Sequence, residues 1–184
     1  TSTRWPERSP RVTQLFMRRP AAAGPVVLPP LPDRMTSRDA IAADADAIAV
    51  LLADAFDEAW DGDRVRRDLL DADDVVRTHL LVEDGTLIGT ASERIMPEHP
   101  GAGYVHWVGV STAARGRRLG ALLTQRCVQG FIERGLDDAV LETDDFRVPA
   151  VLSYLRLGFV PEYRSDAERD AWSVLFPSLV GGRP

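Results

Sequence analysis

The stretch ARGRRLGALL, residues 114–123, decides the fold of this chain. It follows an apolar run at residues 105–110 and opens a long helical pattern, so a strand passes into a helix across a bend rich in glycine and arginine. Backbone N–H groups of a first helical turn lack partners within the helix, and the positive end of the helix dipole lies there. Gly116 and Gly120 allow close approach to the backbone, and the three arginines add donors. The bend therefore predicts a site for a phosphate or pyrophosphate.

Composition indicates one soluble folded domain. The chain has 184 residues, 45% of them apolar, which suits a single core of about 150 residues. Its net charge of −6 argues against a general nucleic-acid binder, although all 22 basic residues are arginine. The single cysteine, Cys127, excludes an intramolecular disulfide and a cysteine zinc cluster, and is typical of a reducing, cytoplasmic compartment. Since no apolar run approaches ~20 residues, we expect no membrane span.

The N-terminal part has a different composition. Residues 1–38 hold seven arginines against Glu7 and Asp33, together with seven prolines. Because this composition opposes regular structure, we expect residues 1–25 to form a flexible arm and residues 26–184 to form the domain. An organellar transit peptide is the alternative, but prolines interrupt the helix that it would need. Residues 26–28, Val-Val-Leu, are compatible with an edge strand, where flanking prolines are tolerated.

Helical periodicity begins after this arm. Apolar residues recur at helical spacing over residues 41–56, and a second short helix is expected over residues 63–70. The intervening segment, residues 57–61, is acidic and holds Trp60. It forms either a wall of a substrate site or a solvated connection with the indole in the core.

Extended patterns follow. An Asp-Gly pair at residues 84–85, between apolar runs, predicts a hairpin of residues 78–83 and 86–91. The next strand is expected at residues 104–110, directly before the bend. The helix after the bend carries a stripe of apolar residues and is predicted to end at Arg134 and Gly135.

The last third predicts one more helix between two strands. Residues 139–143 read as a short strand, Pro149 suits the first turn of a helix that stops at Gly158, and Phe159 begins a return strand. A hairpin followed by strand, helix, strand, helix and strand predicts an α/β fold with a sheet of mixed direction.

Two motifs in this order resemble the GNAT superfamily of acyl-CoA-dependent N-acyltransferases. The phosphate-binding motif of that family starts with Arg or Gln and ends five residues later with Gly or Ala, as Arg115 and Gly120 do here. Arg118 stands where the first motif glycine is expected, and a helical φ at that position would need no glycine. The resemblance is strong over residues 104–163.

The second motif lies in the last predicted helix. The family has an apolar helix with a tyrosine four residues before a Gly-Phe pair, which matches Ala150, Tyr154, Gly158 and Phe159. An asparagine that is frequent three residues before the alanine is replaced by Arg147.

The resemblance implies both a fold and a ligand. The fold would be a central mixed, mostly antiparallel sheet with a splayed pair of parallel strands, flanked by helices. The ligand would be acetyl-CoA or another acyl-CoA, with no metal. Its pyrophosphate would rest on the backbone of residues 115–120, and its pantetheine would pair like an added strand with residues 108–110. The implied cofactor-binding residues are Val108, Gly109, Val110, Arg115, Gly116, Arg117, Arg118, Leu119, Gly120, Arg147 and Tyr154.

Direct acyl transfer needs a proton donor for the leaving thiolate and a proton acceptor for the amine. The motif places Tyr154 as the donor, and a neutral tyrosine is available at pH 7. A backbone N–H near Val108 would stabilise the oxyanion, as in similar enzymes. His106 is our candidate base, since strand alternation places it on the face of Tyr104 and Val108, with Trp107 on the opposite face in the core.

Several alternatives stay open. The base alternatives are Glu142, Asp144, Asp145 and Glu93, and neither His79 nor His99 has a metal-site pattern. The acceptor is a primary amine of a small molecule or protein, recognised by loops expected at residues 57–63, 94–104 and 162–176. The alternative function is a catalytically silent acyl-CoA-binding or sensor module. We expect a monomer or homodimer with no nucleic-acid partner, since phosphate-backbone binding by the arginine-rich turn would require a steep salt dependence.

Overall fold

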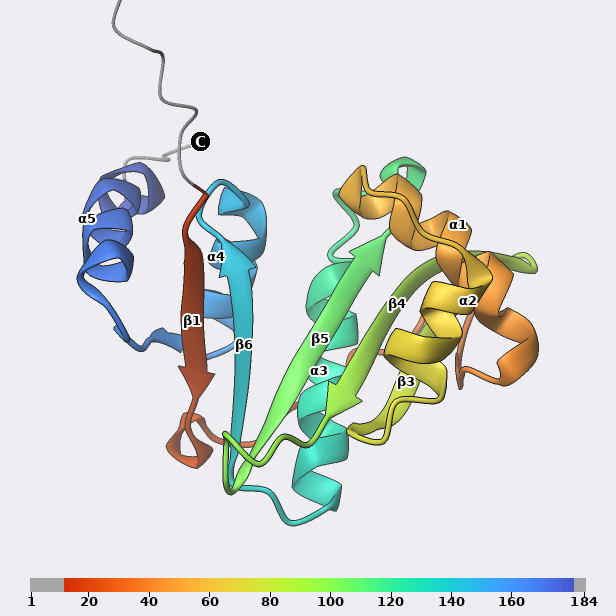
Figure 1. Cartoon of the computed structure of the whole chain (residues 1–184), viewed down its shortest axis with the longest axis horizontal. Helices are drawn as coiled ribbons and strands as arrows, with labels where there is room; N and C mark the ends of the chain where they lie inside the picture. The colour runs from red at the N-terminus through yellow and green to blue at the C-terminus, as the bar shows by residue number, and fades with distance from the viewer. Residues whose placement is uncertain (1–11, 181–184) are drawn as a thin grey trace, which may run out of the picture.

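The computed structural model describes residues 12–180 and contains one seven-stranded sheet in the order β2-β3-β4-β5-β6-β1-β7 (Figure 1). The strands are β1 (Gln14–Arg19), β2 (Met35–Asp39), β3 (Val75–Glu83), β4 (Thr86–Arg94), β5 (Ala102–Val110), β6 (Asp138–Asp144) and β7 (Val160–Pro161). The helices are α1 (Ala45–Phe56), α2 (Gly62–Val65), α3 (Leu119–Glu133), α4 (Val148–Arg156) and α5 (Asp166–Val180), with a π-helical turn at Arg66–Leu70 after α2. The predicted α/β class and mixed sheet are confirmed.

Helices cover both faces of the sheet. α1 and α2 lie over one face of β3, β4 and β5, and α3 lies against the opposite face (Figure 1). The predicted stripe of α3 is buried at Leu123, Cys127 and Phe131, and burial raises the pKa of the Cys127 thiol. Cys127 is therefore an inert core residue, as its helical spacing predicted. No described helix has the length and apolar character needed to cross a membrane.

The predicted hairpin is confirmed as β3 and β4. Their turn places Asp84 and Gly85 in the left-handed region, with φ of 49° and 81°. Two consecutive positive φ values match the right-handed twist of the strands, which is why Asp-Gly is favoured here. The following strand and helix, β5 and α3, also occupy the predicted positions.

β5 and β6 form the parallel pair of the sheet, and they separate along their length. Pairing runs from Ala102 with Asp138 to Val105 with Leu141 and then stops. Figure 1 shows the two strands together at one end and apart at the other. The edge of β5 beyond Val105 is therefore left without a β6 partner, in agreement with the predicted splay.

The prediction of a flexible arm over residues 1–25 is wrong for its second half. Gln14–Arg19 form β1, which lies between β6 and β7, with Leu15, Phe16 and Met17 buried. The run of three apolar residues shows no period of two because both faces of an interior strand are covered. Residues 26–28, by contrast, form no strand. The first eleven residues of the predicted arm lie outside the described part of the chain.

The C-terminal segment also differs from the prediction. A loop was expected at residues 162–176, whereas α5 begins at Asp166 and packs against β1. Trp172 and Leu175 are buried on its inner side, and Asp166 and Glu168 lie in its first turn, where the helix dipole favours acidic residues. This helix depends on packing against the N-terminal strand, a partner far away in sequence.

Replacing Gly103 by alanine should destabilise the fold. A Cβ at Gly103 would lie 2.2 Å from ring atoms of Phe131, so β5 or α3 must shift. We expect the free energy of unfolding, measured by urea denaturation, to fall by about 2–3 kcal/mol. The double variant Gly103→Ala/Phe131→Leu should regain part of this loss. An unchanged unfolding midpoint in Gly103→Ala would contradict the packing described here.

Candidate active site

A β-bulge in β5 shapes the centre of the site. Between the pairs Thr90 with Gly109 and Ser92 with His106, the single residue Ala91 of β4 faces both Trp107 and Val108. Trp107 has φ of 47°, which is rare for a bulky residue. A bulge leaves one residue out of the ladder and redirects the side chains on either side.

The bulge changes the face of the sheet on which the β5 side chains after His106 lie, and so contradicts the prediction. Trp107 shares the α1 side of the sheet with His106 and packs edge-on against Phe56 and Trp60, at ring-centroid distances of 5.1 and 4.7 Å. Val108 instead packs on the α3 side, near Gly120. Strict alternation had placed His106 with Val108 and opposite Trp107, and this prediction is wrong because the extra residue reverses the alternation.

The absence of a side chain at Gly109 has a structural role in packing α1 against β5. A Cβ at this position would lie 3.0 Å from Leu52 Cδ2 and 3.4 Å from Phe56. The missing side chain lets α1 approach β5 closely.

A cavity of about 390 Å³ opens where β5 and β6 separate. Its walls include Phe56 at the end of α1 and Glu58 after it, Tyr104 and His106 of β5, Glu142 of β6, Arg147 directly before α4, and Tyr154 of α4. The cavity therefore brings together the two predicted catalytic residues with Arg147 and Val108, whereas the arginine-rich turn lies outside its walls.

The bend before α3 has the backbone of an anion site. Gly116 and Arg118 are left-handed, with φ of 79° and 60°. Within the described part of the chain, no protein group accepts a hydrogen bond from the N–H groups of residues 118–121. These four donors point to no internal acceptor and remain free for a ligand.

Arg118 corrects one sequence prediction. A right-handed helical φ was expected there, but the residue takes the left-handed conformation that the family's glycine would adopt easily. For a residue with a Cβ this conformation costs about 1–2 kcal/mol.

The three arginines of the bend have different surroundings. Arg117 donates to both oxygens of Glu83 at 2.8 and 2.6 Å, and Arg115 Nη2 donates to the Ala55 carbonyl at 3.0 Å. The Arg118 side chain is exposed, and its guanidinium makes no hydrogen bond to any other described residue. Among the three described guanidinium groups, Arg117 is bound to a carboxylate, Arg115 is partly engaged and Arg118 is wholly free, so most of the free donors of the bend are backbone N–H groups.

The end of α1 holds this region in place. The Asp54 carboxylate accepts hydrogen bonds from Thr112 N at 2.6 Å and Thr112 Oγ1 at 2.7 Å. These bonds lower the pKa of Asp54 and anchor the chain between β5 and the bend.

Tyr154 is suited to hold a proton at the cavity. Its ring is 9% exposed and lies edge-on to Phe159, with centroids 5.9 Å apart. Its hydroxyl bonds to no other described residue, and burial raises its pKa to about 12. Tyr154 is therefore protonated at neutral pH with its hydroxyl uncommitted.

His106 is less suited to accept a proton from the amine. Burial and the neighbouring Arg94 lower its pKa to about 4. Its Nε2 lies 3.3 Å from Arg94 Nη1; because a guanidinium only donates, Nε2 accepts in this contact. Arg94 in turn is held by Asp74. The imidazole is therefore neutral, and the lone pair of Nε2 is engaged.

Two of the alternative bases line the cavity. Glu142 accepts from Tyr104 Oη at 3.3 Å and from Arg164 Nη2 at 2.5 Å, and burial beside Glu142 raises the pKa of Tyr104. Asp144 is bound by Arg147 Nε at 2.9 Å.

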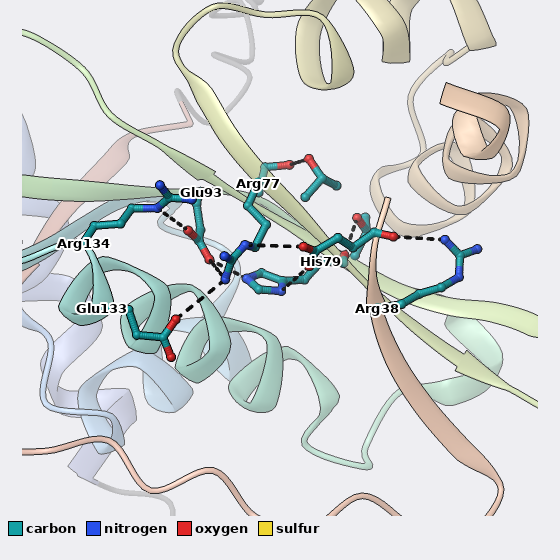
Figure 2. A network of polar contacts seen from close by, with 10 residues as sticks. Arg38, Arg77, His79, Glu93, Glu133 and Arg134 are labelled. Atoms are coloured by element: carbon teal, nitrogen blue, oxygen red, sulfur yellow. Dashed lines mark hydrogen bonds and ion pairs between the residues drawn. The ribbon is translucent and has the colours of Figure 1, made fainter. Parts of the chain in front are cut away.

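The other two alternatives lie away from the cavity. Asp145 accepts from Thr13 N. Glu93 is fully buried beside α3, where Figure 2 shows it among His79, Arg77 and Arg134. Its Oε1 is 2.6 Å from His79 Nε2, and its Oε2 is 3.5 Å from Arg134 Nε. Glu93 therefore belongs to an ion network of the core. Among residues 12–180, no group of three or more His, Cys, Asp or Glu side chains could hold a metal ion.

Protonation of His106 should weaken the fold in acid. Its pKa is about 4 in the folded chain and about 6.5 in an unfolded one. The contribution of the neutral His106 imidazole to the free energy of unfolding is thus complete above about pH 6.5. As pH falls toward about 4, this contribution is lost, by up to about 3 kcal/mol. We expect His106→Asn to lose less unfolding free energy than the parent between pH 7 and pH 4.5 in urea titrations. Parallel curves for the two proteins would contradict this prediction.

Comparison with known proteins decides the family. The model of the Acetyltransferase (GNAT) family matches residues 45–159, from α1 through the second motif. This chain belongs to the GNAT family. The fold is similar to that of a GCN5-related N-acetyltransferase from Sphaerobacter thermophilus, with a TM-score of 0.68 at 22% sequence identity. The aligned part is 84% of this chain and 50% of the Sphaerobacter chain.

Curated relatives lie within the same family. A mycothiol acetyltransferase of Salinispora tropica is 37% identical over 155 residues, 78% of this chain and 50% of the relative. One of Streptomyces avermitilis is 34% identical over 150 residues, 78% of this chain and 48% of the relative. The chain thus spans about half the length of these relatives.

Sequence reasoning missed the residues that support the site from a distance. Asp54, Glu83 and Arg94 are surface-type residues on three different elements, and no local pattern links them to Thr112, Arg117 or His106. The bulge at Trp107 has one local signal in Gly109, because a glycine within a strand is compatible with a bulge as well as with close approach of a ligand.

Proposed function

We propose that this protein transfers an acetyl group from acetyl-CoA directly to a primary amine of a small molecule or a protein. The observation that carries the proposal is the separation of β5 and β6. It leaves an open strand edge and a cavity of about 390 Å³ with Tyr154 in its wall. Family membership supports the same reaction class. The single buried thiol of Cys127 supports a reducing, cytoplasmic location.

The residues present fit acetyl-CoA at two places. The free N–H groups of residues 118–121 and the Arg118 side chain would hold the pyrophosphate, beside Gly116 and Gly120. The edge of β5 at Val108 to Val110 would pair with the amide-containing pantetheine as an added strand. Arg147 and Tyr154, at the cavity wall, would contact the arm near its thioester.

The transfer step follows from the cavity groups. The amine nitrogen bonds to the acyl carbon, the C–S bond breaks, and Tyr154 Oη gives its proton to the departing sulfur. A backbone N–H at the bulge near Val108 stabilises the negative charge that develops on the acyl oxygen, since a bulge frees ladder groups.

We propose Glu142 rather than His106 as the group that takes the proton of the amine. Glu142 lines the cavity, and its two oxygens keep acceptor sites beyond the bonds from Tyr104 and Arg164, whereas the single Nε2 lone pair of His106 is engaged by Arg94. Glu142→Gln should then lower kcat more than His106→Asn does. The reverse order would restore the imidazole as the base.

The function is tested by mixing purified protein with acetyl-CoA and a panel of amines, and measuring free thiol and the mass of each product. The panel contains the acceptor of mycothiol acetyltransferases, because relatives carry that name. It also contains a lysine peptide, a peptide with a free N-terminus and small diamines. Acetylated amine in step with thiol release is expected. Tight acetyl-CoA binding without thiol release on any amine would indicate the silent sensor module instead.

A further inference from the structure

A buried arginine without a carboxylate partner among residues 12–180 lies outside the walls of the active-site cavity. Arg19, the last residue of β1, is 6% exposed. Its Nε donates to the Leu157 carbonyl at 2.9 Å and its Nη2 to the Gly24 carbonyl at 2.6 Å. Both acceptors are neutral, and no described carboxylate lies within 4.0 Å of the guanidinium. The adjacent Arg18, by contrast, is paired with Asp138 and Glu162.

An unpaired buried charge is unusual. Buried arginines are almost always paired, and a guanidinium keeps its proton in proteins. Burial lowers the pKa of the Arg19 guanidinium. Nη1 of Arg19 makes no hydrogen bond to any described residue. The side chain thus carries a positive charge and free donors that no group of the described chain satisfies.

Arg19 lines two cavities outside the active site. One, of about 460 Å³, also contains Asp137 and Asp138, whose negative charges disfavour an anion. The other, of about 300 Å³, has no acidic residue in its wall and contains a second arginine, Arg156. Arg156 is exposed and has no ion pair with any described residue. This second cavity, which we call the Arg19 pocket, shares no wall residue with the active-site cavity.

Apart from Gln125, the other side chains in the wall of the Arg19 pocket are apolar. Val26 and Val27 form one side, Val128 of α3 another, and Leu157 after α4 a third. Gln125 Nε2 donates a hydrogen bond to the Val27 carbonyl oxygen at 3.1 Å. The pocket thus combines two cations with an aliphatic wall, at the small end of the volumes of ligand sites.

We propose that the Arg19 pocket binds a small aliphatic monocarboxylate. The carboxylate lies between the guanidinium groups of Arg19 and Arg156, and the hydrocarbon part packs on the valines. This site goes beyond the proposed acetyl transfer and does not depend on it. Arg19 comes from β1, the strand that the sequence had assigned to a flexible arm.

The test uses 3-methylbutanoate as the probe and 3-methylbutanamide as its neutral isostere. Binding is measured by isothermal titration and thermal shift on the full chain saturated with coenzyme A. We expect 3-methylbutanoate to bind with a Kd of about 1 mM or tighter and to raise Tm. The amide should bind at least about tenfold more weakly, because charge-assisted hydrogen bonds are lost.

Variants decide whether the pocket is responsible. Because Arg156 is exposed, Arg156→Gln should leave the fold intact. It should raise the Kd for 3-methylbutanoate about tenfold. Arg34→Gln, an exposed arginine of the opposite sheet edge, is the matched control and should change nothing. Arg19→Met should abolish binding, but it also releases two backbone carbonyls, so Arg156→Gln carries the decision.

Four results would overturn the proposal. They are equal binding of acid and amide, an unchanged Kd in Arg156→Gln, binding of the probe only when coenzyme A is omitted, and binding of inorganic phosphate in place of the carboxylate. Each of these can occur with acetyl transfer intact, so failure here is distinguishable from failure of the proposed function.

Discussion

Replacing Tyr154 by phenylalanine is expected to lower kcat by about 100-fold or more, while the Kd for acetyl-CoA changes by less than about twofold. The substitution removes one hydroxyl that bonds to no other described residue, and the ring keeps its contact with Phe159. The loss should therefore fall on proton transfer to the departing sulfur. Steady-state kinetics with calorimetric titration of acetyl-CoA separate the two quantities.

The pH dependence sharpens this test. A thiolate needs no proton donor at a pH above the thiol pKa of about 8.5, so the defect of Tyr154→Phe should be smaller at pH 9 than at pH 7. Tyr163→Phe is the matched control, since Tyr163 is exposed and lies outside the cavity. Normal turnover in Tyr154→Phe would remove this residue from the proposed mechanism.

Replacing Gly120 by glutamate should weaken acetyl-CoA binding by about 100-fold or more. Gly120 is the second residue of α3, next to the free N–H groups, and a carboxylate there would occupy and repel the anion site. The fold should be retained, because a Cβ would meet Val108 Cγ1 at 3.9 Å and Val110 Cγ2 at 4.0 Å, which are ordinary contacts. An acidic residue in the first turn of a helix is also compatible with its dipole.

Two control variants separate charge from bulk. Gly120→Ala should bind acetyl-CoA as the parent does, and Gly120→Gln should show the part of the loss that size alone causes. Calorimetric titration of all three, with thermal unfolding to verify the fold, gives the comparison. Unchanged affinity in a folded Gly120→Glu variant would place the pyrophosphate elsewhere, and the proposed function would lose its cosubstrate site.

Sequence alone determined the local elements and their order. The Asp-Gly hairpin, the helix that follows the arginine-rich bend and the helix that stops just before Gly158 all lie where the patterns predicted. Turn chemistry, helical periodicity and caps depend on residues that are neighbours in the chain, so a short window of sequence contains them. The two motifs also brought Tyr154 and the bend into one predicted site before any geometry was known.

Tertiary structure alone decided the facing and the partners of the site residues. Trp107 turned toward α1 because of a bulge in the pairing of β5 with β4, and Arg118 took a left-handed φ at the start of α3. Arg117 bound Glu83, and Gln14–Arg19 became an interior strand beside β6. The facing of Trp107, the ion pair of Arg117 and the place of Gln14–Arg19 depend on contacts between residues distant in sequence, which form only when the sheet closes.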